Sequence, residues 1–191
     1  PFTSQKGGAV ISTHEHAWKM GGEGPGTNAR RSWVYRYDFS SDNEQIRSGT
    51  HPLPTGVSNG LSYQTRAGDR GYFSQFWPGP DNIIRQENQT ETLSSLGTGT
   101  SNNLIFNYTT ESYGYSFGGS QPDNSVPAGI NRFDFSTESY TSIPATLDTA
   151  VKFGAAAASP QRAHIFGGIN APGQYTNNID QFEYSTETAS A

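Results

Sequence analysis

The residues best suited to chemistry in this sequence are two histidines separated by one residue, His14 and His16. Side chains two positions apart on a β-strand point to the same face, and imidazole nitrogens are common ligands of zinc. His51 or His164 could supply a third ligand. A weak metal site at His14 and His16 is therefore one hypothesis. The simpler interpretation, which we favour, is a solvated or hydrogen-bonded histidine pair with no bound metal or other cofactor.

Other catalytic patterns are missing from the sequence. The chain has no cysteine, which excludes a disulfide, a thiolate zinc site and a cysteine nucleophile. It has no Gly-x-Ser-x-Gly nucleophile motif, no phosphate-binding loop and no calcium-loop pattern. Carboxylates such as Glu111, Asp123 and Asp148 are scattered, and their spacing does not pair any two for acid–base work. We therefore predict that the protein is not an enzyme.

Aromatic residues indicate binding more than they indicate catalysis. An exposed aromatic ring can stack on a sugar ring, and Trp77 and Tyr175 are the two candidates for such a ligand-binding role. Trp77 lies in a Phe-Trp-Pro-Gly-Pro segment that favours an exposed loop, whereas Trp18 and Trp33 lie in predicted strands, where we expect them to be packed. Two Asn-x-Thr motifs make Asn88 and Asn107 candidate glycosylation sites, at about the frequency that chance gives.

The elements that position these residues are β-strands. Of the 191 residues, 32% are hydrophobic and 15% charged, and no segment has the periodicity of an amphipathic helix or the length of an apolar membrane span. The net charge of −5, without a basic cluster, argues against a nucleic-acid partner. We expect a single all-β domain over 1–191.

An internal repeat supports this expectation. A strand motif occurs four times, with its acidic residue at Asp38, Glu87, Asp134 and Glu183, so that the copies are spaced by 49, 47 and 49 residues. A Gly-Gly pair precedes it in three copies, at 21–22, 118–119 and 167–168. The repeats run approximately over 8–54, 55–103, 104–153 and 154–191. The last repeat has Pro160 and Arg162 where the first has its histidines, which weakens the metal hypothesis.

Each repeat is expected to form one four-stranded antiparallel blade of a β-propeller. A run of small or apolar residues forms the first strand, an aromatic strand ending in Gly-Gly follows, and the acidic motif lies on the third. The basic residues Arg36, Arg85 and Arg132 lie two positions before the acidic ones, so we interpret the two positions as repeating salt bridges between blades. The N-terminal strand either closes a four-bladed ring or completes a blade in a neighbouring subunit.

The segments Gly114–Gly119, Ile130–Glu138 and Ile179–Ala189 resemble kelch-type repeats, in particular the degenerate kelch-like repeats of predicted virion proteins of aquatic phages. The resemblance spans nearly the whole chain and departs from the pattern in the second repeat, at Ser74-Gln75 and Asn88. It implies a propeller in a phage tail or fibre, or in an extracellular filament, located on a virion surface or outside the cell. The expected partners are copies of the chain, other assembly proteins and surface glycans. A soluble carbohydrate-binding lectin is the alternative, and a metal-dependent enzyme is third.

Overall fold

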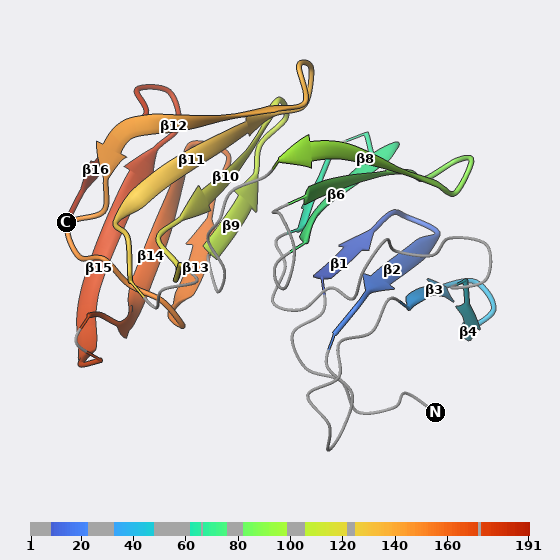
Figure 1. Ribbon diagram of the computed structural model, residues 1–191, viewed down its shortest axis with the longest axis horizontal. Coiled ribbons are helices and arrows are strands. Elements are labelled where there is room, and N and C mark those ends of the chain that lie inside the picture. The colour runs from blue at the N-terminus through green and yellow to red at the C-terminus, as the bar shows by residue number, and fades with distance from the viewer. Residues whose placement is uncertain are drawn as a thin grey trace. The chain divides into compact units, whose positions relative to one another are not determined.

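The computed structural model describes residues 9–22, 33–47, 62–65, 67–75, 82–98, 106–121, 125–171 and 173–191, and these contain strands and no helix (Figure 1). Within these ranges no helix could cross a membrane. The strands form four antiparallel sheets, which we call blades 1 to 4. Blade 1 contains β1 (Ala9–Ser12), β2 (His16–Met20), β3 (Val34–Asp38) and β4 (Asn43–Ile46); blade 2 contains β5 (Ser62–Gln64), β6 (Arg70–Gln75), β7 (Asn82–Glu87) and β8 (Thr92–Thr98). Blade 3 contains β9 (Phe106–Thr109), β10 (Tyr113–Phe117), β11 (Gly129–Asp134) and β12 (Ser139–Thr146); blade 4 contains β13 (Ala155–Ala158), β14 (Arg162–Ile169), β15 (Tyr175–Glu183) and β16 (Thr188–Ser190).

In every blade, strands that follow one another in the chain are hydrogen-bonded neighbours. The predicted fold class, an all-β chain of four-stranded antiparallel propeller blades, is confirmed. The strands of each blade lie within one of the four predicted repeats. Contacts divide the chain into two compact units, 1–100 with blades 1 and 2, and 101–191 with blades 3 and 4.

The hairpin between the first two strands of each blade starts with a hydroxyl residue. Thr13 Oγ1 accepts hydrogen bonds from the backbone N–H groups of Glu15 and His16, at 3.2 and 3.0 Å. The equivalent residue in the other blades accepts in the same way from the N–H at the start of the second strand. These residues are Thr65, Thr110 and Ser159. Each hairpin is therefore stabilised by a local hydrogen bond to a side-chain hydroxyl. This bond does not replace any hydrogen bond between paired strands.

The turn between the third and fourth strands is also repeated. It contains an acidic residue with positive φ in each blade, namely Asp42, Glu91, Glu138 and Glu187. In blade 1, Asp38 Oδ1 accepts hydrogen bonds from the N–H groups of Ser40 and Ser41, at 2.9 and 3.1 Å, and from the Ser40 hydroxyl. Asp134 binds Ser136 and Thr137 in the same way in blade 3. We predicted from the sequence that the acidic residue at the end of the third strand forms a salt bridge between blades. This prediction is wrong for blades 1 and 3, because Asp38 and Asp134 cap their own turn.

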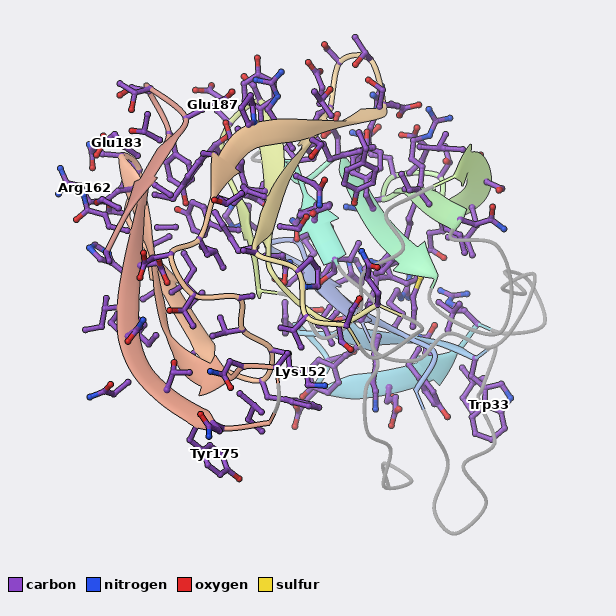
Figure 2. The ribbon with its side chains drawn as sticks, turned by 60° about the vertical axis from the view of Figure 1, so that its left-hand side comes forward. Trp33, Lys152, Arg162, Tyr175, Glu183 and Glu187 are labelled. Carbon is purple, nitrogen blue, oxygen red and sulfur yellow. The ribbon has the colours of Figure 1, made fainter. Side chains whose placement is uncertain are left out.

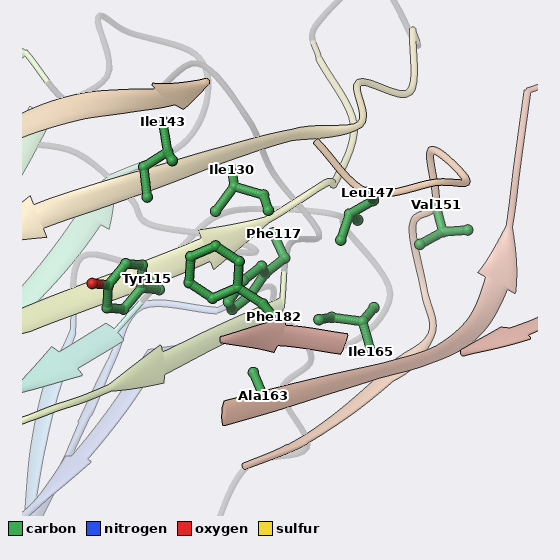
Figure 3. Close-up of a cluster of buried hydrophobic side chains, with 9 residues drawn as sticks. All are labelled: Tyr115, Phe117, Ile130, Ile143, Leu147, Val151, Ala163, Ile165 and Phe182. Atoms are coloured by element: carbon green, nitrogen blue, oxygen red, sulfur yellow. The ribbon is translucent and has the colours of Figure 1, made fainter. Parts of the chain in front are cut away.

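The apolar core of each unit lies between its two blades. In the first unit, Trp18, Met20 and Val34 of blade 1 pack against Phe73 and Ile84 of blade 2. Trp18 is thus packed as predicted, whereas Trp33 is partly exposed, with its ring edge-on to Tyr35. In the second unit, the core joins blades 3 and 4 with part of the segment between β12 and β13 (Figure 3). Its buried members are Tyr115, Phe117, Ile130, Ile143, Leu147, Val151, Ala163, Ile165 and Phe182.

Candidate functional site

The blades of each unit are joined by the same ion pair. Arg36 of β3 donates a hydrogen bond to Glu91, which lies in the turn between the third and fourth strands of blade 2. Arg132 of β11 donates one, at 2.7 Å, to Glu187 in the same turn of blade 4. In both units the two residues are 55 positions apart. Two of the three predicted arginines, Arg36 and Arg132, therefore bridge the blades, and their partner is the turn glutamate. The third, Arg85, lies with its Nε 3.0 Å from Oε1 of Glu87, the acid two positions along the same strand.

In the second unit this ion pair belongs to a small, partly buried network. The Tyr115 hydroxyl donates to Glu187 Oε1 at 3.1 Å, and the Arg132 guanidinium lies 4.7 Å from the Tyr113 ring centroid. Burial, together with the Glu187 carboxylate, raises the pKa of Tyr115, and the hydrogen bond that Arg132 donates to Glu187 raises the pKa of Arg132. Both groups therefore remain donors at neutral pH. The carboxylate of one blade is held by two side chains of its neighbour.

Blade 4 has two different faces. On one face, Ala163, Ile165 and Phe182 are buried against blade 3, where the Phe182 ring lies 5.4 Å from Tyr115 and 5.3 Å from Phe117. The residues that alternate with these along the strands lie on the other face, where Phe166 is 39% and Ile179 is 51% exposed. We call this second face the open face: Ala155, Ala157, Arg162, His164, Phe166, Tyr175, Ile179, Gln181 and Glu183.

The centre of the open face is apolar and one end is charged. Ala155, Phe166 and Ile179 lie directly opposite one another on three adjacent strands. At one end Arg162 Nε lies 3.3 Å from Glu183 Oε2. Figure 2 shows this pair at one end of the sheet and Tyr175 at the other. An apolar centre with a polar margin is typical of a protein interface.

Tyr175 lies at the start of β15 with 87% of its surface exposed, which is consistent with a ligand-binding role. It pairs with Ile169, which is bonded on its other side to Lys152 by two backbone hydrogen bonds. The next residue, Phe153, is 58% exposed and has a positive φ of 57°, and the Lys152 ammonium lies 6.0 Å from its ring centroid. A bulky side chain in this backbone region is uncommon and such strain gathers at functional sites. Tyr175, Phe153 and Lys152 therefore form a candidate ligand-binding end of the open face.

The other predicted binding residue, Trp77, lies outside the described residues. His14 is exposed in the turn before β2, so only His16 is on the strand, and the two do not share a strand face. His16 Nε2 is 3.4 Å from Asp38 Oδ2. His51 is also outside the described part of the chain, and no group of three metal-ligating side chains is found among the residues that the structure describes.

The two candidate glycosylation sites differ in their surroundings. Asn88 is half-buried and its Nδ2 donates to the carbonyl oxygen of Gly68 at 2.8 Å, so the nitrogen that would carry a glycan is in use. Asn107 is exposed on β9. The open face itself was not predicted from the sequence, although Phe166 and Ile179 occupy the same repeat positions as the buried Phe117 and Ile130. That similarity is the signal that could have revealed it.

The models of known protein families do not match this chain, and none of the curated proteins matches it significantly.

Proposed function

We propose that this chain is a non-enzymatic structural and adhesive module of kelch-like blades, acting in a phage tail or fibre or in an extracellular filament. The observation that supports this most is the open face of blade 4. Phe166 and Ile179 occupy the repeat positions through which Phe117 and Ile130 of blade 3 bind blade 4. An exposed apolar surface of this kind favours assembly, because each blade buries its apolar residues only against a neighbour.

The repeated polar contacts support the same proposal. Arg36–Glu91 and Arg132–Glu187 join blade to blade, and the Asp38 and Asp134 carboxylates are used by their own turns. These charged groups therefore stabilise blade contacts and turns, and they are not arranged around a reacting centre. Blade packing repeated along a chain suits an architectural role.

The test is sedimentation velocity of the purified chain over a wide range of concentration, with negative-stain electron microscopy of the same samples. An architectural module is expected to form ordered polymers or defined oligomers as concentration rises. A strict monomer at every concentration would refute assembly as the function. Incubation with Zn²⁺ serves as a control for adventitious bridging through surface histidines.

A carbohydrate-binding propeller is the second candidate, and the exposure of Tyr175 and Phe153 favours it. Two exposed aromatic rings can stack on pyranose faces, and CH–π contacts of this kind need no buried pocket. A glycan array should then show a preference that is lost in Tyr175→Ala and Phe153→Ala. The matched control is Phe39→Ala, which removes an aromatic ring that is 48% exposed on the other unit.

A further inference from the structure

The contact between blades 1 and 2 contains a buried amide side chain that lacks a partner. Gln86 of β7 is 1% exposed, and neither its Oε1 nor its Nε2 has a hydrogen-bond partner in the part of the chain that the structure describes. Burying an amide without hydrogen bonds is costly, and most buried polar groups in proteins bond to another protein group or to water. The Gln86 amide therefore indicates that this contact holds a polar occupant.

Gln86 lies on the face of blade 2 that packs against blade 1. It shares this face with Ile84, which is two residues earlier on β7 and belongs to the core of the first unit. Across the sheet it pairs with Gly71 of β6 and with Leu93 of β8. Leu93 packs against the same core, and a Cβ on Gly71 would meet Ile11 of blade 1. The amide is therefore inside the contact between the two blades of this unit.

The second unit has an aromatic ring at the same position. Phe182 occupies the repeat position of Gln86, and its ring lies 5.4 Å from that of Tyr115 in blade 3. Leu93, which pairs with Gln86, replaces the smaller Ala189 that pairs with Phe182, and so takes up part of the space of the ring. The fold can thus fill this position with carbon alone, whereas the first unit holds a polar group there.

Asn88 supplies a further acceptor on the same side of the strand. It lies two residues after Gln86, directly after the end of β7, and occupies the repeat position of the larger Tyr184. Its Nδ2 donates to the carbonyl oxygen of Gly68 at 2.8 Å, whereas its Oδ1 is buried and accepts from none of the described residues. Gln86 and Asn88 together therefore offer two acceptor oxygens and one donor nitrogen.

We propose that ordered water is bound between blades 1 and 2, held by the Gln86 amide and by Asn88 Oδ1. A buried water makes about three hydrogen bonds, to groups that would otherwise be unsatisfied. Water both donates and accepts, so it matches two oxygens and one nitrogen. A cation would leave the Nε2 donor unused, and an anion would be repelled by the two oxygens. The site lies within the core of the first unit and does not depend on the assembly proposed above.

The test is water–protein NOE spectroscopy of the full ¹⁵N-labelled chain. The side-chain amide protons of Gln86 are identified as those missing from the spectrum of Gln86→Met. A water that stays longer than the protein takes to tumble gives NOE and ROE signals of opposite sign, and we expect this pattern at the Gln86 amide. The exposed Gln89, assigned through Gln89→Met, is the matched control, because brief surface hydration does not give the pattern. Absence of the pattern at Gln86 would overturn the inference.

Urea unfolding followed by tryptophan fluorescence gives a second readout, because all three tryptophans lie in the first unit. Methionine has the length of glutamine without its polar atoms, so Gln86→Met removes the amide with little change of shape. If water satisfies the amide, removing both the amide and its water is close to neutral, and the urea midpoint should change no more than in Gln89→Met. A clear rise of the midpoint in Gln86→Met alone would show that the wild-type amide has no partner, and would refute the bound water.

Discussion

The contact between blades 3 and 4 should depend on Glu187 more than on any ion pair of the open face. Its carboxylate accepts a hydrogen bond from Arg132 Nη1 at 2.7 Å and one from the Tyr115 hydroxyl at 3.1 Å. Arg132 and Glu187 are only 27% and 30% exposed. A hydrogen bond to a charged group contributes about 1.5–3 kcal/mol when buried, and partial exposure reduces this. We expect Glu187→Gln, which retains an acceptor oxygen, to cost about 1 kcal/mol.

The matched control is Glu183→Gln. It removes the same charge from a longer ion pair, 3.3 Å, in which Arg162 is 46% exposed. Exposed pairs contribute little, so the expected cost is below about 0.5 kcal/mol. Tyr115→Phe and the double variant with Glu187→Gln complete a cycle that isolates the hydroxyl–carboxylate interaction.

The assay can distinguish the two units. All three tryptophans lie in the first 100 residues, so tryptophan fluorescence follows the first unit, whereas far-ultraviolet circular dichroism follows the strands of both units in urea unfolding. Glu187→Gln should lower the urea midpoint of the circular dichroism signal and leave that of tryptophan fluorescence in place. If Glu183→Gln lowers the free energy of unfolding as much as Glu187→Gln does, the contribution of Glu187 to stability does not come from its burial between the blades.

Three further outcomes are expected. Hydrogen bonds from Ser40 lower the pKa of Asp38 to about 2, and those from Ser136 lower the pKa of Asp134. Both carboxylates therefore stabilise the fold above their unfolded pKa, and this stabilisation is lost as the pH falls. Asp134→Ala should accordingly reduce the loss of stability at acidic pH in a stability-versus-pH curve. Burial raises the pKa of Asp180, so the stability of the fold falls as the pH rises through that pKa. In Asp180→Asn the amide oxygen can still accept the hydrogen bond from the Asp148 N–H. Thermal melts should therefore show this variant to be more stable than the wild type at pH 7 but not at pH 3. Gly71→Ala should destabilise the first unit by about 1–3 kcal/mol, measured by tryptophan fluorescence in urea, because its Cβ would lie 2.0 Å from Ile11 Cδ1.

Much of the fold could be predicted because the relevant information is local and repeated. Two-residue alternation in segments such as Ile130–Asp134 predicts a strand with two unlike faces, and the four spaced copies predict four sheets of the same kind. The roles of the acidic residues could not be predicted in this way. Asp38 and Glu91 carry the same charge and lie near strand ends, yet Asp38 caps its own turn and Glu91 pairs with Arg36 of the preceding blade.

The candidate site was predicted only in part. Tyr175 is predicted from the sequence as an aromatic residue for ligand binding, and its exposure agrees with a surface role. The histidine pair was judged from spacing alone, and spacing does not reveal that His14 precedes the strand on which His16 lies. The open face could not be predicted because the exposure of a strand's residues depends on whether another blade covers them. The sequence of the strand does not contain this information.

The sequence by itself determined the all-β class, the four blades and the positions of their strands, since these follow from alternation, glycine placement and a repeat that each segment carries within itself. Only the tertiary structure decided which arginine meets which glutamate and which apolar face is covered. Phe117 and Phe166 occupy equivalent positions in their repeats, but Phe117 is fully buried and Phe166 is not. The physical reason is that a blade face is buried by its neighbour, so identical local patterns become core in one blade and surface in another.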